Sequence, residues 1–305
     1  MKNIKTRFLL AAFLAACTSG GGPGGPDPGI DPPLITPATP LGAFAADGQM
    51  LVYPVRAALA AERLVLVSDY AAGSVVGLRD GVPVLSVKNL ERPLGLAVSG
   101  NLLYVGCEGR KTVEVYDLAE RRPVIAAAGF GKPNAIAVSP DGLLIYVVDS
   151  KAGVVRVLNP DLTLARTLGA PGSADGQLLN PVSVAVDATR VAVADQGNRR
   201  VVFFDPAGAF VKNVGGEMTT TQVRGRFTTI SSVAFSGEDL YVLDAAHALV
   251  QVFDAAGAPK GLLGQAGECD ACVKLALDIA VGADGVVLAT DPEHRRVVAL
   301  STEMR

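Results

Sequence analysis

The sequence predicts an all-β fold, namely a six-bladed β-propeller with four-stranded blades. One strand pattern recurs six times, at a mean spacing of about 44 residues between Asp69 and Asp291, which lies within the range of propeller blades. The second strand of each copy is apolar on both faces, as in 64–67 and 144–148. Because a sheet that faces water alternates apolar and polar residues, these runs indicate strands buried between stacked blades.

Each copy supplies a first strand, a short turn and a second strand. First strands are predicted at 58–60, 96–98, 136–138, 184–186, 233–235 and 279–281, and second strands at 64–67, 102–105, 144–148, 191–194, 240–243 and 286–289. Third strands are clearest at 112–116, 154–158, 200–204, 249–253 and 296–300, and fourth strands at 164–168 and 210–214. The segment 57–63 is rich in alanine, which favours a helix, but the repeat predicts a strand there.

An acidic or polar residue follows every second strand. These positions hold Asp69, Cys107, Asp149, Asp195, Asp244 and Asp291. Such a set suggests a ring of ligands. However, Asp side chains also accept hydrogen bonds from backbone amides two residues on and so set tight turns. We favour this structural interpretation, because no matching set of bases or metal partners accompanies the aspartates.

The repeats resemble those of the NHL family. The segment 180–205, which contains Asn180-Pro181-Val182 and Asp195-Gln196-Gly197-Asn198, is similar to that family's full pattern. Repeats two and three are closer to the related YVTN propellers, as in 139–148. The chain has no Trp, which argues against a WD40 protein. The resemblance implies a six-bladed propeller.

The N-terminus predicts a lipoprotein signal peptide over residues 1–16. Lys2, Lys5 and Arg7 precede an apolar run that is too short to span a bilayer. The next residues, Leu14-Ala15-Ala16-Cys17, resemble the bacterial lipobox, which implies that Cys17 carries the lipid. The alternative is an ordinary signal peptide followed by a chance cysteine. Thr18 is not Asp, and by the same resemblance we expect the outer rather than the inner membrane.

Residues 17–40 are dominated by Gly and Pro and predict a disordered tether, with the propeller occupying 41–305. Removing the three basic residues of the leader leaves 24 basic against 30 acidic residues, a net charge of −6. An acidic surface repels the phosphate backbone of nucleic acid. We therefore expect no nucleic-acid partner. The signal peptide and Cys17 predict a protein of the cell envelope that its lipid attaches to the membrane, and we expect it to be a monomer.

Two histidines and three basic pairs occupy equivalent turns of the repeats. His247 and His294 each lie three positions after the aspartate of their blade, and imidazole is a common metal ligand. Equivalent turns of neighbouring blades are usually too far apart to share an ion, so we favour plain turn residues and expect no cofactor. Basic pairs follow the same turns at 110–111, 199–200 and 295–296. They would attract an anionic partner, but solvated turn residues are the simpler interpretation.

The remaining cysteines predict one disulfide and one free thiol. Cys269 and Cys272 form a Cys-x-x-Cys in the connection between the fifth and sixth repeats. No second pair or following His completes a zinc or haem site, so a local disulfide is expected after export. Cys107 stands beside an apolar strand where other blades have Asp, which indicates a buried free thiol.

The sixth repeat lacks a fourth strand, because the chain ends at Arg305 soon after 296–300. Propellers avoid an unpaired edge of this kind. The segment 49–53, Gln49-Met50-Leu51-Val52-Tyr53, precedes the first complete repeat and favours a strand. We predict that 49–53 pairs with 296–300 and closes the ring.

These observations favour a binding or scaffolding module for a protein or an envelope glycan, with specificity in the loops of a rigid face. The alternative is a metal-dependent hydrolase or lyase of the six-bladed class, similar to the lactonases. Three or more convergent carboxylates, amides or histidines in the central channel would favour the enzyme. A channel lined by small and apolar side chains would favour the binding module.

Overall fold

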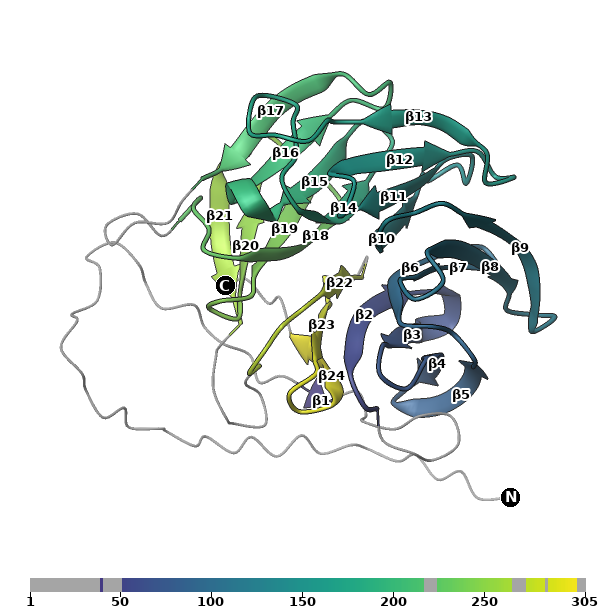
Figure 1. Cartoon of the computed structure of the whole chain (residues 1–305). Coiled ribbons are helices and arrows are strands. Elements are labelled where there is room, and N and C mark those ends of the chain that lie inside the picture. Colours follow the sequence, from purple (N-terminus) through teal and green to yellow (C-terminus); the bar gives the residue numbers. More distant parts are fainter. Residues whose placement is uncertain (1–38, 41–50, 217–223, 265–272, 283–284, 301–305) are drawn as a thin grey trace, which may run out of the picture. The chain divides into compact units, whose positions relative to one another are not determined.

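The computed structural model describes residues 39–40, 51–216, 224–264, 273–282 and 285–300. Over these residues the chain forms six four-stranded antiparallel sheets (Figure 1). The innermost strands β2, β6, β10, β14, β18 and β22 contact one another in that order, and β22 also contacts β2. The sheets are therefore the blades of a closed six-bladed propeller, and the predicted fold class is confirmed.

Each of the first three blades runs from its inner strand to its outer strand in chain order. Blade 1 has β2 (Pro54–Leu59), β3 (Leu64–Asp69), β4 (Ser74–Arg79) and β5 (Val82–Val87). Blade 2 has β6 (Pro93–Ser99), β7 (Leu102–Cys107), β8 (Thr112–Asp117) and β9 (Arg122–Ala128). Blade 3 has β10 (Pro133–Val138), β11 (Ile145–Asp149), β12 (Val154–Leu158) and β13 (Leu164–Leu168).

The remaining blades follow the same order except for the outer strand of the last. Blade 4 has β14 (Pro181–Val186), β15 (Val191–Asp195), β16 (Arg200–Phe204) and β17 (Phe210–Gly215). Blade 5 has β18 (Ile230–Ser236), β19 (Asp239–Asp244), β20 (Leu249–Phe253) and β21 (Pro259–Leu263). Blade 6 has β22 (Ile279–Val281), β23 (Val287–Asp291) and β24 (Arg296–Leu300).

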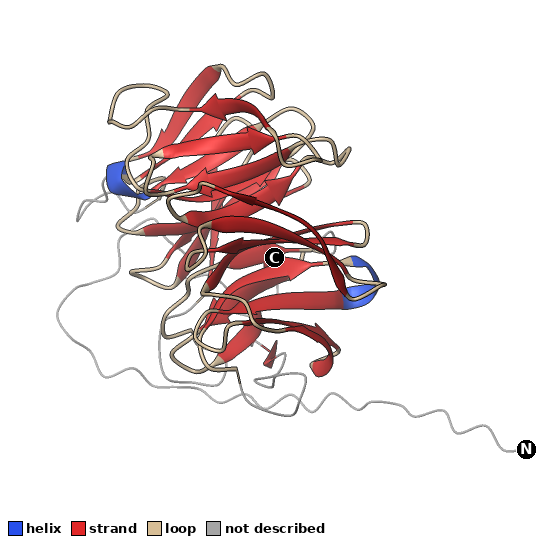
Figure 2. Ribbon diagram, turned by 45° about the vertical axis from the view of Figure 1, so that its right-hand side comes forward, coloured by secondary structure: helices blue, strands red, loops and turns tan. Residues whose placement is uncertain are grey.

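Helical structure in the described residues is limited to two short 3-10 turns, coloured blue in Figure 2. The first, η1 (Ala61–Arg63), takes the end of the alanine-rich segment, whose earlier residues form the predicted strand. The second, η2 (Gln196–Asn198), follows the second strand of blade 4. No helix in the described ranges is long and apolar enough to cross a membrane.

The second strands are buried, except for the first residue of β7 and of β19, because blades pack on both of their faces. Tyr146 and Val148 of blade 3, for example, share one apolar cluster with Val191 and Val193 of blade 4. Similar clusters lie between the other neighbouring blades. The continuous apolar runs in the sequence thus correspond to strands that are packed between neighbouring blades, as predicted.

The aspartates that end the second strands bind the linkers between blades. Asp149 Oδ2 and Oδ1 accept the backbone N–H groups of Gly131 and Lys132 at 2.9 and 3.0 Å. Asp69, Asp195, Asp244 and Asp291 bind linker amides in the same way. All five carboxylates are buried. The structural interpretation was right, but these linker amides lie 15 to 18 residues upstream and not two residues on.

The ring closes through an N-terminal strand, as predicted, but through a different segment. Strand β1 (Thr39–Pro40), at the end of the predicted tether, pairs with β24 in the register Thr39 to Ala299 and Pro40 to Val298. The predicted closure by 49–53 is wrong, since residues 51–53 form no strand and 49–50 lie outside the described residues. Instead 51–53 is the linker that Asp69 holds.

Leu51 is fully buried between the last blade and the first, beside Val67 and Val297. Truncation of a buried leucine to alanine costs about 2–5 kcal/mol through lost burial and the cavity left behind. We predict that Leu51→Ala destabilises the protein by about this amount in urea unfolding. Val52→Ala is the control, because Val52 is 47% exposed, and equal unfolding curves for the two variants would contradict this packing.

Substitution of the buried Asp149 should destabilise the protein strongly. Asp149→Ala leaves the N–H groups of Gly131 and Lys132, and the Arg156 guanidinium at 3.1 Å, without their acceptor. We predict a loss of about 3–5 kcal/mol in unfolding free energy. The control is Asp161→Ala, which removes only an exposed local turn contact to Thr163. A loss for Asp149→Ala no larger than that of the control would refute the role of the carboxylate.

Candidate functional site

A β-bulge near the start of the inner strands directs one residue per blade toward the propeller axis. The pairing register shifts after the first residue of β2, β6, β10, β14 and β18. A bulge inserts an unpaired residue and re-aims its side chain. The residues at the shift, with the equivalent residue of blade 6, are Val55, Leu94, Asn134, Val182, Ser231 and Leu277.

These six residues, together with Arg56 and Gln196, line a pocket of about 150 Å³. The pocket therefore lies where all six blades meet. It opens at the end of the propeller where the linkers arrive and the inner strands begin, which we call the linker face. The opposite end carries the turns between the first and second and between the third and fourth strands, and we call it the turn face.

A buried ion pair lies beside the pocket, between the first and last blades. Arg56 Nη1 lies 2.6 Å from Asp278 Oδ1, and the two side chains are 9% and 7% exposed. Arg56 Nη2 donates to the carbonyl oxygen of Val182 at 2.6 Å. Asp278 also accepts the N–H of Ala57 at 3.0 Å and the hydroxyl of Ser232 at 2.7 Å. The pair thus joins blades 1, 4, 5 and 6, and its hydrogen bonds offset the cost of burying both charges.

Small residues occupy the equivalent positions of the other blades. Arg56 and Asp278 occupy the same place in the repeat, directly after the bulge residue. The other four blades have Gly95, Ala135, Ser183 and Ser232 there. A Cβ at Gly95 would meet Ile136 and the backbone of Ala135 in blade 3, and Ser183 Oγ accepts the N–H of Val233 in blade 5. Small residues at this position therefore let the inner strands of neighbouring blades approach closely, and Arg56 and Asp278 form an ion pair where the first and last blades meet.

Ser231 contributes an unpaired polar atom to the site. The residue is 7% exposed, and its Oγ has no hydrogen-bond partner within the described ranges. Asn134 donates to Ser150 Oγ at 3.0 Å, and Gln196 donates to the carbonyl of Ile230 at 2.8 Å. An unsatisfied buried hydroxyl costs about 1–3 kcal/mol. We expect a water or a ligand group to bind Ser231.

The two histidines do not converge. His294 Nδ1 lies 2.6 Å from Asp291 Oδ2, and His247 Nδ1 lies 3.5 Å from Asp244 Oδ2. Each imidazole thus contacts the aspartate of its own blade. Within the described ranges, no group of three or more His, Cys, Asp or Glu side chains is placed to hold a metal ion.

One member of each basic pair contacts a carboxylate of its own blade. Arg200 Nε donates to Asp195 at 2.9 Å, and Arg296 Nε lies 3.5 Å from Asp291. Arg110 contacts Glu91 and Glu114 at 3.3 and 3.2 Å. Arg200 and Arg296 are only 13% exposed, so these two arginines are largely buried ion-pair partners and not the solvated turn residues that we expected.

Blade 2 has Cys107 in place of the linker aspartate, and a carboxylate, Glu114, lies nearby on the next strand. Glu114, on β8, accepts the hydroxyls of Thr112 and Tyr116 at 2.8 and 2.6 Å and contacts Arg110. Burial alone would raise the pKa of Glu114, but the hydrogen bonds from Tyr116, Thr112 and Arg110 hold it below its ordinary value. Cys107 is a buried free thiol, as predicted. Burial, followed by the nearby Glu114 charge, raises its pKa to about 12.

Cys17, Cys269 and Cys272 lie outside the described residues, so lipid attachment and the disulfide remain predictions. The sequence analysis missed Arg56 and Asp278. Alignment of the repeats carries a signal for them, because one Arg and one Asp stand in a column otherwise occupied by Gly, Ala and Ser. Opposite charges in such a column, in blades that become neighbours on closure, indicate an ion pair on the axis.

The Arg56–Asp278 pair should show strong energetic coupling. Removing one member leaves a buried charge uncompensated, so we predict that Arg56→Met costs about 3–5 kcal/mol in urea unfolding. Adding Asp278→Asn should recover part of the loss. The exposed pair Arg63–Asp80, at 3.9 Å, is the control, with coupling below about 1 kcal/mol. Additive losses for Arg56 and Asp278 would contradict the coupling.

Cys107 should be chemically silent in the folded protein. The thiolate is the reactive form, and a buried thiol with a pKa of about 12 supplies almost none of it at neutral pH. We predict that iodoacetamide leaves Cys107 unmodified until guanidinium unfolds the chain, as measured by peptide mass spectrometry. Alkylation of Cys107 at the same rate with and without denaturant would show that the thiol is accessible.

Comparison with known proteins gives similarity of fold alone. No protein-family profile matches the chain, and no curated protein sequence does either. A structure of Kuenenia stuttgartiensis hydrazine synthase superposes with a TM-score of 0.62 at 14% identity, covering 84% of this chain and 97% of that one. A streptogramin B lyase structure superposes with a TM-score of 0.59 at 9% identity, covering 80% and 78%. Because both identities are below 25%, these likenesses concern the propeller fold alone, and the NHL resemblance remains a prediction.

Proposed function

We propose that this chain is a lipid-anchored propeller of the cell envelope that binds a protein or glycan partner on its linker face. The observation that carries the proposal is the small axial pocket on that face, lined by residues of all six blades. Rigid scaffolds with variable loops are suited to recognition. The Arg56–Asp278 pair supports this role, because it fixes four blades around the pocket.

The size of the pocket favours recognition of part of a larger partner. Sites that enclose a whole small molecule usually measure about 300–1,000 Å³, whereas this pocket measures about 150 Å³. It is large enough for one side chain or one sugar unit. The unpaired Ser231 hydroxyl and the amides of Asn134 and Gln196 would bind polar atoms of that group, while Val55, Leu94 and Val182 would contact its apolar part.

The alternative, a metal-dependent hydrolase or lyase, lacks a supporting observation. Such chemistry requires several metal ligands that converge on the channel. The described lining of the axial pocket holds two amides, Asn134 and Gln196, and no carboxylate or histidine, and Asp278 beside it is bound to Arg56. The likeness to a streptogramin B lyase concerns the fold, and function depends on the residues of the site.

Attachment is tested through Cys17. If Cys17 carries the lipid, we predict that Cys17→Ser abolishes labelling by radioactive palmitate and releases the protein from membranes. A mature protein that keeps its label and stays in the detergent phase would refute the proposed anchor. The control is Cys107→Ser, which removes a buried thiol and should leave labelling unchanged.

Binding is tested with a photo-crosslinking residue at position 134 on the linker face or at Leu143, which is 60% exposed on the turn face of the same blade. We predict a defined crosslinked product in intact cells from position 134 and none from position 143. The product should disappear when Gln196→Arg crowds the pocket. Equal products from both positions would contradict linker-face binding, and metal-dependent ester or lactone hydrolysis by the purified protein would favour the enzyme.

A further inference from the structure

The axial pocket has an apolar half and a polar half. The neighbouring blades 6, 1 and 2 contribute apolar residues at the bulge position, and blades 3, 4 and 5 contribute three polar side chains. These are Leu277, Val55 and Leu94 on the apolar side and Asn134, Gln196 and Ser231 on the polar side. Val182 of blade 4 adds an apolar contact on the polar side. A lining divided in this way orients a ligand group that is apolar at one end and polar at the other.

The polar half offers one free donor and one free acceptor. Ser231 is 7% exposed, and among the described residues its Oγ has no hydrogen-bond partner. The Ser150 hydroxyl donates to the carbonyl oxygen of Pro181, so it accepts its second hydrogen bond, from Asn134 Nδ2 at 3.0 Å. This fixes the orientation of the Asn134 amide and leaves its Oδ1 available as an acceptor. The Ser231 hydroxyl is available as the donor.

The described lining of the pocket carries no unpaired charge. Arg56 Nη1 is bound to Asp278 at 2.6 Å, and Nη2 donates to the carbonyl oxygen of Val182 at 2.6 Å. Gln196 donates to a backbone carbonyl through Nε2 and accepts from Asn180 through Oε1, both at 2.8 Å. A charged group that entered the pocket would lose its hydration without gaining an oppositely charged partner. The lining therefore favours a neutral group with one acceptor and one donor.

We propose that the axial pocket binds the acetamido group of an N-acetylated amino sugar. The Ser231 hydroxyl donates to the acetamido carbonyl oxygen, and Asn134 Oδ1 accepts the acetamido N–H. A trans amide directs its oxygen and its N–H in opposite directions, and the blades of these two residues lie on opposite sides of blade 4. The methyl group contacts the apolar half, where its burial favours binding. This inference rests on the proposed function and makes the partner on the linker face a glycan.

The rim of the pocket offers further contacts to a sugar ring. Asn180 is exposed beside Gln196, to which it donates at 2.8 Å. An amide both donates and accepts hydrogen bonds, as the hydroxyl groups of a sugar do. Tyr53, which is 37% exposed, lies in the linker two positions before Val55 and presents an aromatic ring. A sugar ring has an apolar C–H face and a polar hydroxyl edge, so both kinds of contact suit it.

The test uses the full chain with Cys17→Ser, in which no lipid can be attached at that position. The probes are the methyl β-glycosides of N-acetylglucosamine, glucosamine and glucose, which differ only in the group on the second carbon of the ring. Each is titrated into the isotope-labelled protein and followed by NMR. We expect saturable binding of the acetylated probe and at least tenfold weaker binding of the other two. Equal binding of the three probes, or no binding of the acetylated one, overturns the proposal.

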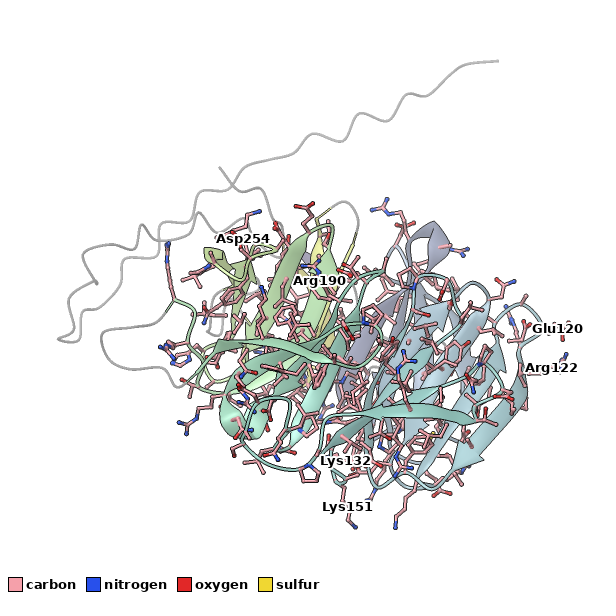
Figure 3. All side chains as sticks on the ribbon, turned by 90° about the horizontal axis from the view of Figure 1, so that it is seen from above. Glu120, Arg122, Lys132, Lys151, Arg190 and Asp254 are labelled. Atoms are coloured by element: carbon pink, nitrogen blue, oxygen red, sulfur yellow. The ribbon has the colours of Figure 1, made fainter. Side chains whose placement is uncertain are left out.

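The backbone signals that shift locate the binding site. We expect the acetylated probe to shift the N–H signal of Ser231 and to leave those of Arg190 and Asp254 unchanged. Figure 3 shows Arg190 and Asp254, of the turn face, away from Lys132 and Lys151, which belong to the linker face. Saturable shifts of the turn-face signals alone would place the sugar elsewhere and overturn the proposal.

Ser231→Ala removes the free donor and leaves no buried group unpaired. We expect this variant to unfold at the same or a higher urea concentration than the parent, and to bind the acetylated probe about fivefold more weakly, as for the loss of one neutral hydrogen bond. Ser236→Ala is the matched control, because Ser236 ends the same strand and its hydroxyl donates to the carbonyl of Gly282 at 3.1 Å. It should change binding less than about twofold. Equal effects of the two variants overturn the proposal.

Two further outcomes separate this inference from the proposed function. Binding of Nε-acetyllysine methyl amide as tight as that of the acetylated sugar would overturn the assignment to a glycan. A protein crosslinked to position 134 in cells, without binding of the acetylated probe, would overturn the inference and keep linker-face recognition. Equal crosslinking from positions 134 and 143 would contradict the proposed function, whereas the titration with purified protein would still support an acetamido site.

Discussion

In five of the six blades, a buried aspartate at the end of the second strand holds the linker that leads into that blade. Asp69, Asp149 and Asp244 each accept two consecutive linker amides at 2.7–3.0 Å. An ionised acceptor in a buried site gives hydrogen bonds of about 1.5–3 kcal/mol each. Without it the backbone amides would be desolvated and unpaired. The start of each of these five inner strands depends on this contact.

The axial site is a consequence of the fixed inner strands. Bulges place Val55, Asn134 and Ser231 toward the pocket. The next position in the repeat holds Arg56 in the first blade and Asp278 in the last, and the carboxylate of Asp278 neutralises the guanidinium. The pair also joins the first blade to the last, so the same contact that shapes the site helps to close the ring.

Repetition made the fold predictable from the sequence, since the apolar second strand recurs in every blade and its terminal aspartate in five of the six. Contacts between distant repeats were harder to predict. Residues 51–53 have strand-forming side chains, yet Asp69 holds them as a linker, and a shorter strand at Thr39–Pro40 closes the ring. The axial site was missed because Arg56 and Asp278 are 222 residues apart and meet only when the ring closes.

The central claim is that buried carboxylates hold the linkers. Hydrogen exchange of individual backbone amides, followed by NMR, tests it most directly. The account predicts that Gly131 and Lys132, although they lie outside any strand, exchange as slowly as the amides of β11. Exposed turn amides without a buried acceptor, such as that of Ala174, should exchange much faster. Exchange of Gly131 and Lys132 at the rate of such turns would contradict the account.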